Sequence, residues 1–432
     1  MKEIFIKREI LTELRRHLDR KEISLIIGPR QAGKTTVMQV LKRELERKGK
    51  KTLFLSLDFE LDKRFFESQA NLIKKINLEI GEGSSRIYTS LSPKSRGYVF
   101  IDEIQRKENA GLFLKGIYDL KLPYKFIVSG SGSLELKEKI SESLVGRKRI
   151  FEFSTFSFKE FVNYKTDYKY EKKLPDFFAI NKDKAKELFE EYLSFGGYPL
   201  VVLNGEISEK KKLINEIYQS YLEKDISYLL KIKKAADFNN LVKILAGQIG
   251  QLFNLTEISK TLGISLPTVK NYLWYLEKTF IIRRLTPYFR NIRKELIKTP
   301  VFYFCDLGLR NFSLGLFDRN LNYKELGFVF ENFIFNILRE IANKNFYKIY
   351  FWRTKDGAEV DFVLETGRGL IPIEAKCQSL TKPEIPRSFK SFIEKYQPSE
   401  AFLVNLSLDK TIKLNRTKVH FIPVLKLFFQ DF

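Results

Sequence analysis

The sequence predicts a multidomain protein of the α/β class. Its 432 residues are enough for roughly three domains. In the first part of the chain, short apolar runs alternate with amphipathic stretches of helical period, a pattern typical of parallel sheets with helices between the strands. Two helix signals separated by a short turn follow after residue 250, and alternating strand signals surround a tight turn at 365–369.

The stretch IIGPRQAGKTT, residues 26–36, has the spacing of a phosphate-binding loop. Gly28 is followed by four residues and then by Gly33, Lys34 and Thr35, which fits the pattern without a mismatch. In such loops backbone N–H groups surround the phosphates, the lysine reaches the β- and γ-phosphates, and the threonine hydroxyl binds Mg²⁺. The sequence therefore predicts that the protein binds ATP together with Mg²⁺.

The flanking sequence supports this interpretation. An apolar, β-branched run at 23–27 favours a buried strand, and an amphipathic stretch at 35–49 favours a helix. The loop thus connects a strand to a helix, as its mechanism requires, and a glycine-rich turn without a ligand is the alternative. The residues expected to contact the nucleotide are Gly28, Pro29, Arg30, Gln31, Ala32, Gly33, Lys34, Thr35 and Thr36.

Two later strand signals end in polar residues that would complete a nucleotide site. GYVFIDEIQ (97–105) places Asp102 and Glu103 directly after an apolar run, which is the form of a Walker B strand. We expect Asp102 to hold Mg²⁺ and Glu103 to polarise the attacking water, with two solvated acids at a strand end as the alternative. In YKFIVSGSGS (124–133), Ser129 stands where a polar sensor of the γ-phosphate would stand.

The composition limits the partners and metals that the protein can use. With 76 Lys and Arg against 53 Asp and Glu, the formal net charge is +23, which favours a polyanionic partner but also fits a thermophilic source. Two cysteines and two histidines are too few for a disulfide framework or a cysteine zinc site, so a catalytic metal should be a hard cation bound by carboxylates. The charged N-terminus and the lack of a long apolar run predict a cytoplasmic protein without a membrane span.

Residues 255–285 have the spacing of a helix–turn–helix followed by a strand. Gly263 would end the first helix and Ser265 would cap the second, and 281–294 could form the wing of a winged helix. The segment 231–300 carries thirteen basic and four acidic residues, a net charge of +9, which favours DNA as the partner over a protein. The residues expected to contact DNA are Thr268, Lys270, Asn271, Arg283 and Arg284.

The segment 351–376 alternates about the turn ETGRG and predicts a β-hairpin. If the turn is symmetric, Asp361 lies opposite Glu374, and Lys376 lies on the same face as Glu374 because side chains alternate along a strand. Two opposed carboxylates repel each other, which destabilises a hairpin that has only a structural role. A divalent cation bound between them would remove this repulsion.

Glu331 adds a third acid, since it falls on the apolar face of an amphipathic helix predicted at 327–341, where an unpaired carboxylate is costly. Glu331, Asp361, Glu374 and Lys376 resemble the PD-(D/E)xK nuclease constellation in residue type and order. The resemblance implies metal binding by the three acids and catalysis of DNA cleavage by Lys376. A degenerate nuclease fold used for binding and an unrelated salt-bridged hairpin are the alternatives.

The order of the motifs resembles the prokaryotic AAA+ type ATPases that carry a C-terminal domain of unknown function. The motifs are the phosphate loop, FIDEIQ, IVSGSGS, ESLVGRKRIFEF, FSFKEF and YLSFGGYPLVV, and nearly the whole chain takes part. The resemblance implies ATP hydrolysis and places an arginine finger or sensor at Arg147, acting in its own subunit or in a neighbour of a homo-oligomer. A surface basic cluster is the alternative for Arg147.

These features predict a P-loop parallel sheet at 1–160, a helical lid over the nucleotide at 161–250, a winged helix at 251–310 and a nuclease-like α/β domain at 311–432. The expected function is ATP hydrolysis coupled to DNA binding or processing. One alternative is a slow nucleotide-dependent signalling switch whose winged helix and degenerate nuclease-like domain serve for binding. A non-enzymatic DNA-binding module is the other.

Overall fold

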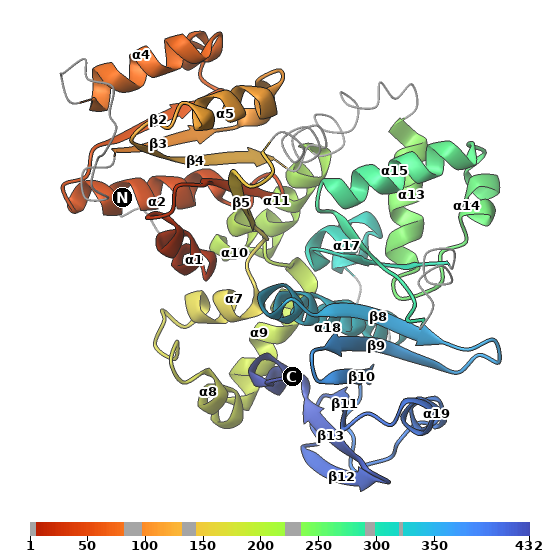
Figure 1. The fold of residues 1–432 in the computed structure, drawn as a ribbon. Coiled ribbons are helices and arrows are strands. Elements are labelled where there is room, and N and C mark those ends of the chain that lie inside the picture. The colour runs from red at the N-terminus through yellow and green to blue at the C-terminus, as the bar shows by residue number, and fades with distance from the viewer. Residues whose placement is uncertain (1–5, 82–96, 132–143, 221–234, 290–298, 319–322) are drawn as a thin grey trace.

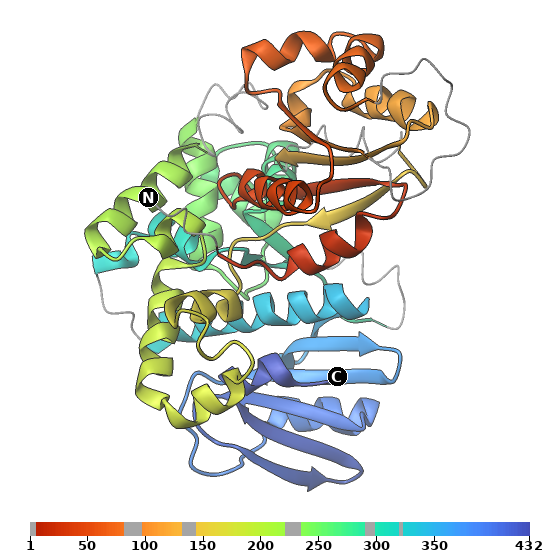
Figure 2. The same ribbon diagram turned by 90° about the vertical axis from the view of Figure 1, so that its left-hand side faces the viewer.

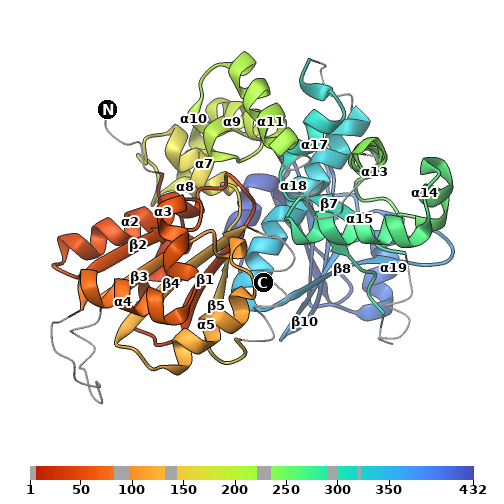
Figure 3. The ribbon, with the colours of Figure 1, turned by 90° about the horizontal axis from the view of Figure 1, so that it is seen from above.

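The structure is a computed structural model that describes residues 6–81, 97–131, 144–220, 235–289, 299–318 and 323–432. An N-terminal sheet and a C-terminal sheet form the two ends of the molecule, and helices from the middle of the chain lie beside them (Figure 1). Helix α18 (Tyr323–Asn345) runs between the two sheets (Figure 2). Seen from above, the N-terminal sheet and helices α13 to α15 lie on opposite sides of the molecule (Figure 3).

The N-terminal sheet has five parallel strands in the order β2-β3-β4-β1-β5. The strands are β1 (Ile23–Gly28), β2 (Thr52–Ser56), β3 (Gly97–Asp102), β4 (Tyr124–Ser131) and β5 (Lys148–Glu152). The surrounding helices are α1 (Ile10–His17), α2 (Lys34–Arg47), α3 (Glu60–Lys63), η1 (Arg64–Phe66), α4 (Gln69–Ile80), η3 (Ile104–Arg106) and α5 (Ala110–Asp119). The predicted parallel sheet with helices between its strands is thereby confirmed.

Both faces of the central strands β1, β3 and β4 are buried, which explains why these strands are almost continuously apolar, whereas the edge strand β5 is largely exposed and carries charged residues. Successive side chains of a strand point to opposite faces. Phe100 accordingly packs in one core with Leu41 of α2, and its neighbour Val99 packs in another core with Leu114 of α5. The carboxyl ends of the strands are therefore left to form a site.

The middle of the chain is helical, as its pattern predicts. It contains α7 (Phe158–Lys165), α8 (Leu174–Ile180), α9 (Lys182–Phe195), α10 (Pro199–Leu203), α11 (Ile207–Ser220) and α13 (Ala235–Gly247). The FGGYP turn separates α9 from α10, with Gly196 in the left-handed region at φ 71°. The N–H of Gly197 donates to the buried carboxylate of Asp306 at 2.8 Å, and the N–H of Phe156 donates to the carbonyl of Gly197 at 2.8 Å.

Two helices and an antiparallel strand pair follow. They are α14 (Leu255–Leu262), α15 (Leu266–Lys278), β6 (Ile282–Leu285) and β7 (Val301–Phe304). Gly263 ends α14 at φ 65°, and the Ser265 hydroxyl accepts from the N–H of Thr268, so both predicted boundary signals act as expected. After β6 the chain pairs with the edge of the C-terminal sheet, through a bridge between Pro287 and Phe351.

The C-terminal sheet has six strands in the order β12-β13-β11-β10-β9-β8. Its elements are α17 (Leu307–Ser313), η5 (Leu316–Asp318), α18, β8 (Lys348–Arg353), β9 (Glu359–Thr366), β10 (Gly369–Ala375), α19 (Arg387–Tyr396), β11 (Glu400–Asn405), β12 (Lys410–Leu414), β13 (Thr417–Pro423) and η6 (Val424–Phe429). The first strands are antiparallel, whereas β10, β11 and β13 are parallel to one another. Phe362 of β9 joins the core on the α18 face, and Val363 joins the core on the α19 face.

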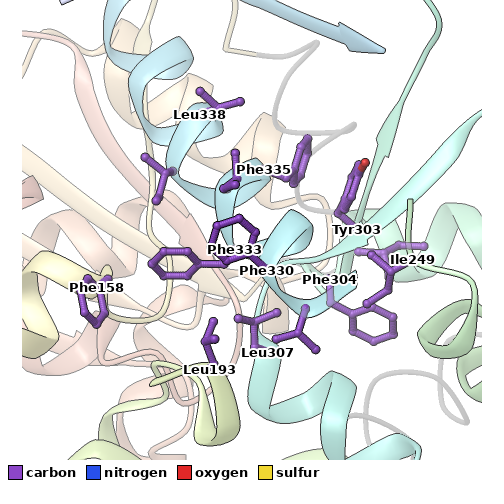
Figure 4. Close-up of a cluster of buried hydrophobic side chains, with 14 of the residues drawn as sticks. Phe158, Leu193, Ile249, Tyr303, Phe304, Leu307, Phe330, Phe333, Phe335 and Leu338 are labelled. Atoms are coloured by element: carbon purple, nitrogen blue, oxygen red, sulfur yellow. The ribbon is translucent and has the colours of Figure 1, made fainter. Parts of the chain in front are cut away.

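One hydrophobic core extends from the middle helices through α14, α15 and the β6–β7 pair to α18 and one face of the C-terminal sheet. Phe330 and Phe333 of α18 lie at its centre, with Phe158 of α7, Leu193 of α9 and Tyr303 of β7 around them (Figure 4). The predicted boundaries at 160, 250 and 310 therefore do not separate hydrophobic cores, and the division into domains stays a prediction. Within the described ranges, no helix combines the length and apolar character needed to cross a membrane.

We predict that Gly197→Ala destabilises the fold. An added Cβ would lie 2.3 Å from the carbonyl oxygen of Phe156, and backbone must move to relieve that contact. Overpacking of this kind costs about 1–3 kcal/mol in the free energy of unfolding, which thermal denaturation measures. The matched control is Gly205→Ala, where an added Cβ meets nothing within 4 Å. Equal midpoints for the two variants would contradict the prediction.

Candidate functional site

The carboxyl end of β1 opens on a cavity of about 1070 Å³. Its floor is the phosphate-loop segment 30–36, and Glu103 and Arg106 line it from the end of β3. Ile6 and Leu200 contribute apolar surface from the N-terminal segment and from α10. This cavity is large enough for a nucleotide.

Within the loop, Gln31 and Gly33 have left-handed backbones, at φ 56° and 95°. The ammonium of Lys34 donates to the carbonyls of Gly28 and Pro29, at 3.1 and 2.7 Å. Gly28 itself serves a packing purpose, because an added Cβ would lie 2.2 Å from the carbonyl oxygen of Phe153.

The two Walker signals meet through a hydrogen bond. The Thr35 hydroxyl donates to Oδ2 of Asp102 at 2.8 Å, and Asp102 is buried. Thr35 lines the cavity and Asp102 lies directly behind it, and a hydroxyl and a carboxylate in contact are a donor set that fits Mg²⁺. Ser129 lies beneath them, donates to Oδ1 of Asp102 and accepts from the N–H of Glu103. Ser129 is fully buried and does not line the cavity, so the structure shows its contact with Asp102, and its predicted contact with the γ-phosphate stays a prediction.

Glu103 reaches the cavity in an unusual conformation. Its backbone is left-handed at φ 57°, and burial raises the pKa of its carboxyl, with Lys34 acting in the opposite direction. The amide Nε2 of Gln105 donates to this carboxylate, and Oε1 of Gln105 accepts from the N–H of Ser131 at 3.2 Å.

Arg147 does not reach the phosphates of its own chain. Its carbonyl accepts from the N–H of Ile23 at the start of β1, whereas the phosphate loop leaves the other end of that strand. Its guanidinium is ion-paired with Asp119 at 2.8 Å. A strand of this length spans roughly 17–20 Å, so the predicted role in its own subunit is wrong, and only action on a neighbouring subunit stays a prediction.

Arg8 is a site residue that the sequence analysis missed. Its buried guanidinium donates to the carbonyl of Ala32 in the phosphate loop at 3.1 Å and forms an ion pair with Glu160 at 3.1 Å. It lies between the rings of Phe153 and Phe156, at 4.2 and 4.6 Å from their centroids. No local pattern distinguishes it from the other basic residues of the N-terminal segment.

The segment 152–156, which begins at the last residue of β5, connects the phosphate loop to the rest of the molecule. Phe153 donates its N–H to the carbonyl of Ile27 at 2.6 Å, and Glu152 is ion-paired with Arg283 of β6. Of the predicted helical lid, α10 and the last residue of α11 line the cavity, whereas the other helices pack against α18 and the C-terminal elements.

The predicted DNA-contacting residues differ in availability. Lys270 and Asn271 are exposed on α15, while the Thr268 hydroxyl is bonded to Ser265 at 2.7 Å. Arg283 is paired with Glu152, and Arg284 is paired with Glu277 at 2.8 Å, so neither guanidinium is a free phosphate contact. Seven of the thirteen basic residues counted in the sequence lie outside the described residues, namely Lys231, Lys233, Lys234, Arg290, Arg293, Lys294 and Lys298.

The C-terminal acids lie in the predicted register. The β9–β10 ladder runs from Gly369↔Thr366 to Ile373↔Phe362, so Glu374 and Asp361 occupy the next opposed position. The β8–β9 ladder shifts at this point, because Tyr350 pairs with Val363 but Trp352 pairs with Val360. One extra residue of β9 forms a bulge at 361–362, and bulges of this kind redirect side chains beside functional sites.

Asp361 and Glu374 each keep a carboxylate oxygen close to a donor. Oδ2 of Asp361 accepts from the N–H of Ala375 at 2.7 Å, and Oε1 of Glu374 accepts from Lys376 at 2.8 Å. Oε2 of Glu374 is buried without a hydrogen-bond partner. An orphaned carboxylate oxygen next to a second acid fits a cation.

Glu331 is held by the preceding strand pair. The Tyr303 hydroxyl donates to its Oε1 at 2.6 Å, and an added Cβ at Gly250 would lie 2.3 Å from the same oxygen. Burial, with repulsion from Glu374, raises the pKa of Glu331 to about 7. Burial and repulsion from Glu374 also raise the pKa of Asp361 well above its usual range. Among the described residues no three acids are arranged to hold a metal, so the predicted three-acid site is not preformed.

Comparison with known families matches the chain in three consecutive parts. Residues 20–162 match the family described as AAA domain. Residues 186–320 match a domain of unknown function (DUF8612), and residues 326–427 match another (DUF4143). With the parallel sheet and the Walker residues, the first match supports a nucleotide-binding P-loop ATPase of the AAA+ type.

Relatives extend over most of the chain. An uncharacterized protein of Mycobacterium tuberculosis is 28% identical over 402 residues, which are 92% of this chain and 79% of that protein. An uncharacterized protein of Methanocaldococcus jannaschii is 25% identical over 397 residues, 90% of this chain and 81% of its own. Among solved structures, the replication initiator DnaA bound to AMPPCP and single-stranded DNA aligns with 63% of this chain and 90% of its own at 16% identity. Its TM-score of 0.30 is too low to establish a common fold.

Proposed function

We propose that the protein hydrolyses ATP at the end of β1 and couples this turnover to DNA binding. The observation that carries the first part is the contact of Asp102 with Thr35, which lines the phosphate-loop cavity together with Glu103. This arrangement places a phosphate cradle, a cation donor set and a carboxylate base in one cavity.

Each residue of the site would have a separate role in ATP hydrolysis. Mg²⁺ bound by Thr35 and Asp102 would neutralise charge on the β- and γ-phosphates. Lys34 would leave the carbonyls of Gly28 and Pro29 for the phosphates, which are stronger acceptors for an ammonium. Glu103 would accept a proton from the attacking water, a role supported by its raised pKa and its place at the cavity wall.

The apolar side of the cavity suits the base of the nucleotide. Leu200 and Leu203 of α10 are 48% and 37% exposed, although both are large apolar side chains. They line the same cavity as the phosphate loop, and an added Cβ at Gly33 would touch Pro199 at 3.8 Å. A bound base would cover these side chains, so nucleotide binding would draw α10 toward the loop.

DNA binding is proposed for the surface of α15. Lys270 and Asn271 are exposed on this helix, and the cap at Ser265 presents its first turn to solvent. The segment 152–156 offers a physical route for coupling, since it contacts Ile27 on one side and is ion-paired to Arg283 on the other. A change in the phosphate loop would therefore reach the strand that follows α15.

A second candidate function concerns the C-terminal acids. The orphaned Oε2 of Glu374 favours a divalent cation held with Asp361, and Lys376 would then stabilise charge on a bound phosphodiester. The order α18, β8, β9, β10, α19, β11 and the bulge at Asp361 also fit a nuclease-like domain. Cation-dependent DNA cleavage that is lost in Asp361→Asn would support an active nuclease. Cation binding without DNA cleavage would support an inactive nuclease fold that serves for binding.

We predict that Lys34→Ala abolishes ATP hydrolysis and weakens nucleotide binding, because the variant lacks the cation that reaches the phosphates. Glu103→Gln should bind ATP normally but turn over about 10²- to 10⁴-fold more slowly, because an amide cannot accept the proton. Steady-state hydrolysis and binding of a fluorescent ATP analogue measure the two effects. The control is Glu108→Gln, an exposed acid nearby. Wild-type turnover in Glu103→Gln would refute the role of Glu103.

We predict DNA binding that weakens steeply with salt, as counterions return to the phosphates. Lys270→Ala should reduce the slope of log K against log salt by about 0.9, the value of one phosphate contact. Arg283→Ala should change it much less, since this guanidinium is paired with Glu152. Lys63→Ala, an exposed lysine of the N-terminal part, is the control. DNA-stimulated ATP hydrolysis distinguishes the coupled enzyme from a slow signalling switch, which does not need it.

We predict that Mn²⁺ raises the thermal midpoint of the wild type but not that of Asp361→Asn. Without metal, the variant should be the more stable protein, since it removes one of several repelling buried acids.

The pH dependence of stability is a further prediction. A carboxyl whose pKa is higher in the folded state than in the unfolded state favours the folded state at low pH. Wild-type stability should therefore fall as the pH rises from about 4.5 to about 7, the unfolded and folded pKa values of Glu331.

The control for the Mn²⁺ titration is Asp409→Asn, an exposed acid directly before β12 that is paired with Lys426. It should respond to Mn²⁺ as the wild type does. Mn²⁺ stabilisation of Asp361→Asn equal to that of the wild type would place the cation elsewhere.

A further inference from the structure

The residues that follow the Walker B acids form a small hydrogen-bonded bridge. Gln105, in the first turn after Glu103, donates from Nε2 to the Glu103 carboxylate and accepts at Oε1 from the N–H of Ser131, the last residue of β4. The side chain thus connects the carboxyl ends of β3 and β4. The proposed catalytic roles above make no use of it.

We propose that Gln105 is a positioning residue for ATP hydrolysis: its side-chain amide holds the Glu103 carboxylate toward the attacking water and fixes it to the end of β4. This inference rests on the proposed ATPase function and assigns a further residue to that site. Gln105 itself is not placed against nucleotide, since it does not line the cavity.

The backbone at Glu103 shows why such a residue is needed. Its left-handed φ of 57° is costly for a residue with a side chain, and strain of this kind is retained where a site demands it. The N–H of Glu103 donates to the hydroxyl of Ser129 in β4 at 3.2 Å, and this hydrogen bond holds the main chain of Glu103 in place. The carboxylate lies at the end of a flexible side chain, and the amide of Gln105 is what restrains it.

The direction of the amide is determined by the protein. The N–H of Ser131 can only donate, so it requires Oε1 of Gln105, and this leaves Nε2 to face Glu103 as a donor. A glutamate at position 105 would present a second carboxylate to Glu103, and an alanine would present nothing. Glutamine is therefore the residue type that satisfies both neighbours.

Charged groups lie around Glu103 on several sides. Lys34 faces the carboxylate from α2, Asp102 from β3 and Asp58 from the end of β2, where Asp58 is itself ion-paired with Arg106. The Gln105 amide donates directly to this carboxylate, so its loss would leave the carboxylate able to turn away from the attacking water.

The test compares Gln105→Ala and Gln105→Glu with the wild type in the full chain, measuring kcat and KM for ATP hydrolysis. Gln105→Ala should lose about tenfold or more in kcat, because the carboxylate is no longer held toward the water. Its KM should stay within about twofold, because the nucleotide contacts remain. Gln105→Glu should lose at least as much, since it repels Glu103 while keeping the side-chain length.

The matched control is Gln69→Ala, which removes a half-buried glutamine of the same sheet layer that donates to the carbonyl of Phe113. A purely structural glutamine would lower the thermal midpoint without a selective loss of kcat, so Gln69→Ala should leave kcat unchanged. Wild-type kcat in Gln105→Ala would overturn the inference while the ATPase function stands. A wild type that binds ATP but never hydrolyses it would overturn both.

Discussion

The close approach of Phe153 to the first glycine of the phosphate loop is the contact on which the arrangement of this molecule depends. Gly28 has no side chain, so the backbone of residue 153 can pass directly beside it and donate to Ile27. The segment 152–156 is thereby held against the nucleotide site. From there, Arg283 pairs with Glu152, and Gly197 accepts from Phe156. These contacts are among those that join the elements after residue 155 to the N-terminal sheet.

Two groups of buried acids differ in how well their hydrogen bonds and charges are satisfied. Asp306 is buried between the FGGYP turn and α17, and it accepts from the N–H groups of Gly197 and Leu309 at 2.8 and 3.2 Å. These donors offset its burial, although its pKa is still raised to about 6. Asp361 and Glu374 repel each other, and one oxygen of Glu374 has no donor. Buried carboxylates that repel each other and lack hydrogen-bond donors are candidates for binding a positively charged ligand.

The positive charge of the chain is a poor guide to single contacts. Many basic residues are used internally, as Arg8 is against Ala32 and Glu160, or Arg283 against Glu152. The net charge of +23 still produces long-range attraction for a polyanion. Short-range binding, however, requires side chains such as Lys270 that are exposed and point to solvent. Composition therefore suggests the class of partner, and packing selects the residues that can touch it.

The sequence by itself determined the features that depend on local spacing. The loop of Lys34 and Thr35, the boundary residues Gly263 and Ser265, and the hairpin register that opposes Asp361 and Glu374 all follow from residues close together in the chain. The hydrogen bonds of turns and helix caps join residues that are only a few positions apart. The sequence pattern alone therefore predicts these features.

Only the tertiary structure decided which distant groups meet. It placed Arg147 at the far end of β1, paired Arg284 with Glu277, and brought Arg8 to the phosphate loop and Tyr303 to Glu331. Each outcome depends on the packing of elements from distant parts of the chain. A charged or hydroxyl side chain carries no local signal of its partner, because the same residue satisfies its hydrogen bonds equally well in water until the fold removes that water.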